Sequence, residues 1–200
     1  MEHPRPDDKN WTWVLERPCP ACRFDAGTIA RHVIGATVRT TVEAWREVLR
    51  RGALVRQRPP GPAARGPIWS ALEYGCHVRD VFVLFEERLR LMLTQDEPTF
   101  ANWDQDATAI AQRYWEDDPA TVCEALVVAG EQLATAFDRV RDDQWQRTGT
   151  RSDGARFTVE SFGRYLLHDP IHHLQDVAEG FATLAGRASR RSGLSEEAGL

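Results

Sequence analysis

The sequence contains almost no lysine. Only Lys9 interrupts a set of 25 basic residues that are otherwise all arginine. Arginine and lysine differ in geometry and hydration, but no requirement of folding demands so complete a replacement. We interpret the bias as the codon preference of a GC-rich genome, which indicates an actinobacterial source.

Long apolar runs and an excess of positive charge are also missing. No apolar stretch approaches the roughly 20 residues of a membrane-spanning helix, and the N-terminal MEHPRPDDKN lacks the apolar core of a signal peptide. The net charge of -5 argues against nucleic acid as a partner, because phosphate binding requires concentrated basic side chains. We therefore expect a cytoplasmic protein that binds neither membranes nor nucleic acid.

Cysteine is scarce, and the common nucleotide-binding motifs do not occur. In a reducing compartment the few cysteines should be thiols and not a disulfide framework. The sequence has no P-loop and no glycine fingerprint of a dinucleotide-binding fold. The four cysteines are Cys19, Cys22, Cys76 and Cys123.

The hydrophobic pattern is helical. Alternation of β-branched residues is rare, whereas apolar residues recur at three- and four-residue spacing over long stretches. This pattern predicts an all-α protein: an antiparallel four-helix bundle with extra short helices and an irregular N-terminal segment. We expect residues 1–24 to dock on the bundle, residues 25–186 to form it, and residues 187–200 to be a mobile tail.

Capping residues mark where the helices should begin. Ser70 followed by Glu73 is a capping box, and Asp118 followed by Pro119 supplies an N-cap with proline at the first helical position. Between the long helices we expect a short helix and at most two short strands. The long helices should cover about 25–50, 70–93, 118–141 and 158–184, the short helix about 106–115, and the strand pair about 148–157.

Three histidines are the strongest chemical signal. His168 and His172 stand four residues apart, so in a helix both rings lie on one face and can converge on one metal ion. His77 lies in an earlier predicted helix and supplies a third imidazole. Three imidazoles leave a divalent ion with an open position for a small ligand. Glu73 and Asp80, about one turn on either side of His77, are expected to orient its ring.

His173 is the alternative to its neighbour His172. A helix turns about 100° per residue, so His172 should lie about 40° from His168 around the axis, and His173 about 140° away. We therefore expect His173 to lie on the core-facing stripe as a buried, hydrogen-bonded residue. Pro170 leaves the choice open, because a kink there would shift the register by one residue.

Two motifs resemble those of a known family. Residues 69–80, WSALEYGCHVRD, match the pattern W-[ST]-x-x-E-x-x-x-H-x-x-D on the second helix of DinB-like proteins, and His168 with His172 matches that family's second metal motif. The chain is similar to this family from about residue 25 to 186. The family includes the mycothiol-dependent maleylpyruvate isomerases. The resemblance implies a four-helix bundle, often a homodimer, that binds zinc or nickel at a three-residue site.

The resemblance and the predicted open metal site together imply a reaction class. We expect a divalent-metal-dependent transferase or isomerase that uses a low-molecular-weight thiol, mycothiol in an actinobacterial setting, on a small electrophilic substrate. Two alternatives stay open. One is a DinB-like protein whose metal serves stability or sensing without catalysis, and the other is a metal-dependent hydrolase.

The tryptophan-rich N-terminal segment carries a C-x-x-C pair, Cys19 and Cys22, which departs from the family pattern. A zinc site would need a second pair of ligands at metal spacing, and a thioredoxin-like motif would need a βαβ pattern around it. Three interpretations stay open: a segment that docks on the bundle, a thiol or disulfide switch, and a metal site. We favour docking, in which the tryptophans extend the core.

Overall fold

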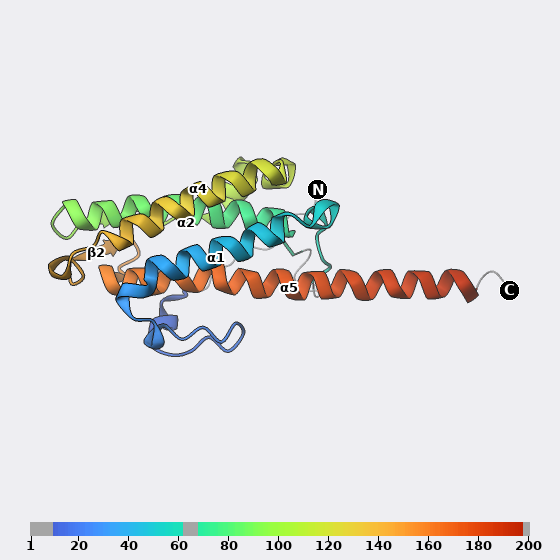
Figure 1. Ribbon diagram of the computed structural model, residues 1–200, viewed down its shortest axis with the longest axis horizontal. Helices are drawn as coiled ribbons and strands as arrows, with labels where there is room; N and C mark the ends of the chain where they lie inside the picture. Colours follow the sequence, from blue (N-terminus) through green and yellow to red (C-terminus); the bar gives the residue numbers. More distant parts are fainter. Residues whose placement is uncertain (1–9, 62–67, 198–200) are drawn as a thin grey trace.

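Four long helices form a bundle in the computed structural model, which describes residues 10–61 and 68–197 (Figure 1). The predicted four-helix bundle is therefore confirmed. A short helix, α3 (Gln105–Ala111), lies in the connection before the third long helix. The long helices are α1 (Ile34–Leu49), α2 (Ala71–Thr94), α4 (Pro119–Asp138) and α5 (Val159–Glu197).

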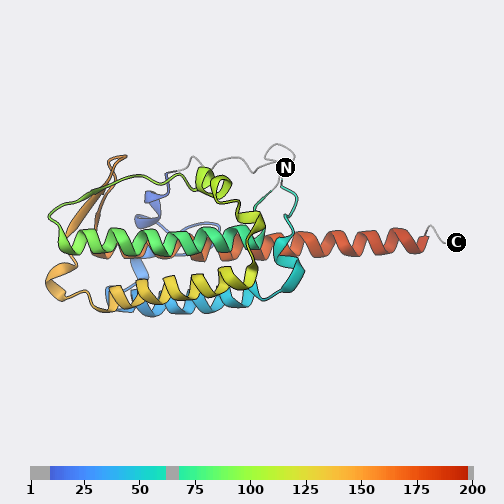
Figure 2. The same cartoon turned by 90° about the horizontal axis from the view of Figure 1, so that it is seen from above.

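The helices are not neighbours in sequence order. α4 packs along both α1 and α2, and α5 also contacts both of them, whereas α1 and α2 touch each other much less. The order around the bundle is thus α1, α4, α2, α5, as the views in Figures 1 and 2 agree. The long connections on either side of α2 make this crossed order possible. It places α5 against α2, the helix that carries His77.

The predicted start of the first helix is wrong. Asp25 accepts a hydrogen bond from the backbone N–H of Gly27, but it caps only a 3₁₀ turn at Ala26–Thr28. The next residues, Ile29 and Ala30, have extended backbone angles that end this turn. A local cap fixes the first turn alone, and the fold sets whether a helix continues.

The capping signals of the later helices are confirmed. The Ser70 hydroxyl accepts from the Glu73 backbone, and the Glu73 carboxylate accepts from the Ser70 backbone, at the start of α2. The Asp118 carboxylate accepts from the Thr121 N–H at 2.9 Å, with Pro119 as the first residue of α4. Each cap satisfies backbone donors that the first helical turn leaves unpaired.

The last helix is longer than predicted. α5 runs without interruption through Pro170 to Glu197, so most of the expected mobile tail is helical. The proline costs one backbone hydrogen bond but does not break the helix. Its carbonyl oxygen accepts a hydrogen bond of 3.1 Å from the indole Nε1–H of Trp45, a fully buried side chain on α1.

A small sheet lies at one end of the bundle. The predicted strand pair is confirmed as the antiparallel strands β2 (Thr148–Arg151) and β3 (Arg156–Thr158). A two-residue strand, β1 (Thr99–Phe100), pairs in parallel with β2, which makes three strands where at most two were expected. Two residues carry no periodic signal, so β1 is set by its partner strand.

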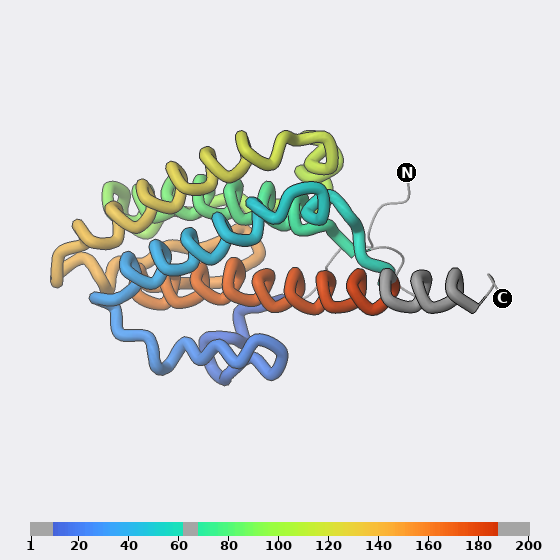
Figure 3. Tube along the Cα trace, turned by 45° about the vertical axis from the view of Figure 1, so that its right-hand side comes forward, coloured from blue at the N-terminus to red at the C-terminus, as the bar shows by residue number. Residues whose placement is uncertain are grey.

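The segment before α1 folds back along the bundle (Figure 3). A 3₁₀ turn at Thr12–Leu15 contacts α5, and Val14 within it is fully buried. The described part of this segment, from residue 10 onward, therefore packs on the bundle, and the rest of the expected docking segment, residues 1–9, lies outside the described residues.

One helix in the described chain has the length and composition of a membrane span. α4 reaches a mean hydropathy of 1.2 over an 18-residue window, although no such stretch was expected from the sequence. Core helices of bundles meet the same criterion, and α4 packs along α1 and α2. The composition of α4 is therefore weak evidence for a membrane.

Gly130 allows α4 to approach its neighbours closely. A Cβ atom at this position would lie 2.3 Å from Val42 Cγ2 and 3.2 Å from the ring of Phe82. Val42 lies on α1 and Phe82 on α2, and both side chains are buried. The missing side chain is thus what lets three helices meet at this level of the bundle.

Substituting Gly130→Ala should lower the free energy of unfolding by about 1–3 kcal/mol, because overpacking a tight core outweighs the gain in helix propensity. Chemical denaturation measures this change. Val128→Ala on the same helix is the control, since Val128 is 55% exposed and its loss should change stability little. Equal stability of Gly130→Ala and the wild type would show that the helices can separate without cost.

Candidate metal centre

Four donor residues on α5 lie within about one and a half turns. They form two pairs with four-residue spacing: His168 with His172, and Asp169 with His173. Since each residue turns about 100° around the axis, the two pairs occupy adjacent faces of the helix. The first face meets the N-terminal segment and the second meets α2, so the donors separate into two groups.

The first group, which we call the histidine–aspartate group, consists of His77, Asp169 and His173. One potential ligand atom from each residue lies within 4.8 Å of the other two. His77 Nε2 is 3.2 Å from Asp169 Oδ1, and His173 Nε2 is 3.8 Å from Asp169 Oδ2. The carboxylate of α5 therefore lies between two imidazoles that come from different helices.

The ring of His173 is held by a second carboxylate. Its Nδ1–H donates to Asp176 Oδ2 at 2.8 Å, which leaves Nε2 as the nitrogen nearest to Asp169. A carboxylate that holds one ring nitrogen in this way fixes the tautomer and strengthens the other nitrogen as a ligand.

Aromatic rings enclose the other side of the group. The imidazole of His77 is fully buried, with Trp103 stacked on it at 5.4 Å and Trp69 at 5.6 Å between ring centres. Tyr74 lies 4.7 Å from the ring of His173. The Nδ1 atom of His77 has no hydrogen-bond partner among the described residues. Asp169 is the more open member, since 32% of its side chain is exposed.

The charge of Asp169 is favoured by its neighbours. Burial raises the pKa of this carboxyl, but its interactions with His77 and His173, which include a hydrogen bond with His77, lower it more, to about 2. Asp169 is therefore an anion at neutral pH. An ionised carboxylate between two imidazoles can bind a divalent cation without first losing a proton.

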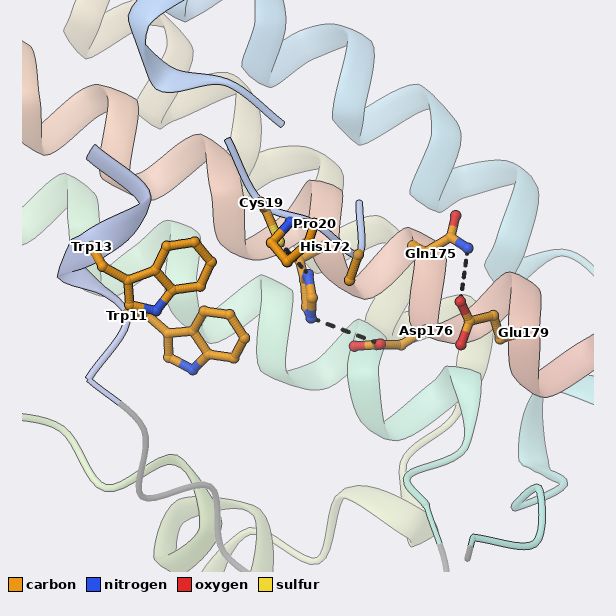
Figure 4. A pocket seen from close by; sticks show the side chains of 9 residues that line it. Trp11, Trp13, Cys19, Pro20, His172, Gln175, Asp176 and Glu179 are labelled. Atoms are coloured by element: carbon orange, nitrogen blue, oxygen red, sulfur yellow. Dashed lines mark hydrogen bonds and ion pairs between the residues drawn. The ribbon is translucent and has the colours of Figure 1, made fainter. Parts of the chain in front are cut away.

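The second group, which we call the cysteine–histidine group, consists of Cys19, Cys22, His168 and His172. Their ligand atoms also lie within 4.8 Å of one another, and Cys19 Sγ is 3.7 Å from His172 Nδ1. Both cysteines are free thiols. Burial is the main cause that raises the pKa of Cys22, to about 11. A pocket of about 370 Å³ opens beside this group, between Trp11, Trp13 and the Asp176 face of α5 (Figure 4).

His168 is the more enclosed histidine of the second group. It is 4% exposed, and its Nε2 atom has no hydrogen-bond partner among the described residues. Burial lowers the pKa of His168 to about 4, and the nearby His172 also contributes. The ring is therefore neutral at pH 7 and keeps a nitrogen lone pair.

The structure groups the predicted ligands differently from the sequence-based expectation. His168 and His172 do share a face, with ring centres 5.0 Å apart, but no group within the 4.8 Å limit joins either of them to His77. His173 faces α2 and not the core stripe, and it is half-buried. The relative spacing on α5 was predicted well, whereas the face that meets α2 depends on how the helices pack. Asp169 and His173 have the same four-residue spacing, and this spacing in the sequence could have identified them as a second pair of donors on one helix face.

The expected orienting role of Glu73 and Asp80 is not seen. The buried Glu73 completes the capping box with Ser70 and accepts a hydrogen bond of 2.8 Å from Arg58. Asp80 accepts from Arg79 Nε at 2.7 Å and from the Tyr114 hydroxyl. Neither carboxylate hydrogen-bonds His77, because both are engaged in contacts that hold loops against α2.

A comparison with family models shows where the chain belongs. A model described as the DinB superfamily matches residues 36–177, which is more than half of the chain. The chain belongs to the DinB superfamily. The resemblance of the two motifs to DinB-like proteins is therefore confirmed. Among curated proteins, no match was found.

A solved structure supports the DinB fold. It is described as "YfiT from Bacillus subtilis is a probable metal-dependent hydrolase with an unusual four-helix bundle topology". The two chains share 18% identity with a TM-score of 0.55, over 96% of this chain and 95% of the other. This likeness shows that the two proteins share a fold over nearly the whole of both chains.

Glu73→Gln should lower the free energy of unfolding by about 1–3 kcal/mol, because the ion pair between the buried Glu73 and the half-buried Arg58 is lost. The same variant should bind as much divalent metal as the wild type, since Glu73 contacts neither donor group. Denaturation and metal analysis of one preparation measure both effects. Glu87→Gln on the exposed face of α2 is the control. Loss of metal with unchanged stability would restore the orienting role for Glu73.

Proposed function

We propose that this DinB superfamily protein is a metal-dependent enzyme whose divalent ion is held by His77, Asp169 and His173. The observation that carries the proposal is the approach of two imidazoles from α2 and α5 to one ionised carboxylate. This ligand set replaces the His77, His168 and His172 set expected from the sequence.

The donor atoms fit a divalent ion. Two imidazoles and one carboxylate are the ligands of a well-known class of catalytic zinc site, and the set also suits nickel or iron. Bonds of about 2.0–2.2 Å at a tetrahedral angle place a nitrogen and an oxygen ligand about 3.4 Å apart. The nitrogen–oxygen distances of 3.2 and 3.8 Å around Asp169 bracket this value.

The side chains around the group divide the remaining tasks. Asp176 holds Nδ1 of His173, which directs Nε2 of the same ring toward Asp169. The rings of Trp69 and Trp103 keep water from the His77 side, so that a substrate would approach from the partly exposed Asp169 side. A divalent ion with only three protein ligands supplies a Lewis acid that acidifies a small fourth ligand.

The proposal also concerns the identity of the nucleophile. The resemblance to mycothiol-dependent isomerases favours a low-molecular-weight thiol, mycothiol first, that attacks a small electrophilic substrate. Water is the second candidate, and it is supported by the description of YfiT as a probable metal-dependent hydrolase. Both nucleophiles need an open position on the metal, and they differ in the kind of substrate that they would attack.

Substituting His77→Ala should lower the bound zinc or nickel by one equivalent per chain relative to the wild type. The reason is that two remaining ligands hold a divalent ion poorly. Elemental analysis of purified protein measures the loss. His32→Gln, an exposed histidine outside both groups, should keep the wild-type content. Full metal content in His77→Ala would place the ion elsewhere.

Metal-loaded protein should accelerate the reaction of mycothiol with a bimane electrophile, relative to metal-depleted protein. Hydrolysis of an activated ester, without thiol, is the parallel assay for the second candidate. Acceleration of the ester reaction alone would identify a hydrolase. Rates equal to those of metal-depleted protein in both assays would favour a non-catalytic role for the metal.

Asp176→Asn should weaken metal binding at the histidine–aspartate group by about 10–100-fold, because the tautomer and basicity of His173 are no longer fixed. Competition with a metallochromic chelator measures the affinity. Glu179→Gln, one turn further along α5, is the matched control. Unchanged affinity in Asp176→Asn would mean that packing against Tyr74 alone orients the His173 ring.

A further inference from the structure

The cysteine–histidine group contains a complete set of four donors, in contrast to the three of the other group. Cys19 and Cys22 are separated by two residues, and His168 and His172 by three. These are the spacings of structural zinc sites with two cysteine and two histidine ligands. The second ligand pair that the C-x-x-C motif lacks in its own neighbourhood is supplied by α5, nearly 150 residues later.

The backbone around the two cysteines is shaped to present both sulfurs. The Arg23 N–H donates to the Cys19 carbonyl and the Cys19 N–H to the Phe24 carbonyl, each at 2.8 Å. Arg23 has a φ of 62°, a left-handed conformation that is costly for a residue with a side chain. This turn brings the sulfur atoms of Cys19 and Cys22 to within 4.8 Å of each other.

The distance between the two halves matches a shared ion. Zinc–sulfur bonds of about 2.3 Å and zinc–nitrogen bonds of about 2.0 Å at a tetrahedral angle place sulfur and nitrogen about 3.5 Å apart. Cys19 Sγ and His172 Nδ1 are 3.7 Å apart. This pair therefore stands close to the separation that a common zinc ion requires, and the ligand atoms of all four residues lie within 4.8 Å of one another.

Burial gives a second, independent indication. Cys19 is 2% exposed and His168 is 4% exposed, and the His168 Nε2 atom has no hydrogen-bond partner among the described residues. A buried imidazole nitrogen without a partner costs free energy. A metal ion bound to this nitrogen would remove that cost. Trp11, Trp13 and Phe24 cover the ring of His168, with centres 5.3, 6.5 and 5.8 Å away.

We propose that Cys19, Cys22, His168 and His172 bind one zinc ion that fastens the N-terminal segment to α5. Four protein ligands fill a tetrahedral coordination sphere, so the ion is structural and has no position for substrate. Binding releases the two thiol protons to solvent and changes no oxidation state. The site is distinct from the histidine–aspartate group and does not depend on its activity.

The ion would act by closing a long loop between two parts of the fold. Without it, the described N-terminal residues are held by the small apolar turn around Val14 and by aromatic contacts with the α5 histidines. With it, the ligands on the segment and on α5 become one rigid unit. Asp169 and His173 lie on the neighbouring face of α5, so the zinc ion would also restrict the movement of the helix that carries them.

The test uses cobalt in place of zinc, because cobalt bound to thiolates shows a charge-transfer band that cobalt bound only to nitrogen and oxygen does not. Protein carrying His77→Ala should keep this band, since only the histidine–aspartate group is damaged. Cys22→Ser and His172→Gln should each lose the tetrahedral spectrum and one equivalent of zinc. Cys123→Ser, a half-buried cysteine outside the group, is the matched control and should keep both.

A second readout tests the structural role and does not need a folded cysteine variant. Trypsin cleavage after the exposed Arg23 should become at least tenfold faster when a chelator removes zinc from the His77→Ala protein. Absence of the thiolate band in this protein, or a cleavage rate that zinc does not change, overturns the proposal. Two titratable thiols in the denatured protein in place of four would also overturn it, because a disulfide would occupy the cysteines.

Discussion

The packing of α5 against two different partners is the constraint on which both donor groups depend. One face of the helix meets α2 and the next meets the N-terminal segment. Because consecutive residues point about 100° apart, a run of alternating donors is divided between the two contacts. A rotation of α5 by one residue would exchange the partners of His172 and His173.

Local signals predicted the parts of the fold that local chemistry decides. The capping box at Ser70 and the Asp118–Pro119 start fix the first turns of α2 and α4, and both were readable in the sequence. Asp25 shows the limit of such signals, because a cap nucleates one turn and tertiary contacts decide its continuation. β1 could not be predicted from local sequence, since it pairs with a strand 51 residues further along the chain.

The donor residues were identified more easily than their grouping. The four-residue spacing of His168 and His172 gives a shared face from sequence alone, and the structure agrees. The face of α5 that meets His77 depends on how α5 is rotated about its own axis in the bundle. No local sequence pattern encodes this rotation. The cysteine pair was missed as a partner because its complementary histidines lie at the other end of the chain. A search that combined C-x-x-C with H-x₃-H over any separation would have found it.

The hydrogen bond from Trp45 to the Pro170 carbonyl helps to position α5, and with it the four donor residues that α5 carries. The buried indole of Trp45 donates to the Pro170 carbonyl, so this hydrogen bond links the rotational setting of α5 to the position of α1. Pro170 lies between the first and the second member of both donor pairs, so a small rotation of α5 there would move all four donors. The rotational setting of α5, which divides the donors between two partners, is thereby tied to a tryptophan on α1, a helix that contributes no residue to either donor group.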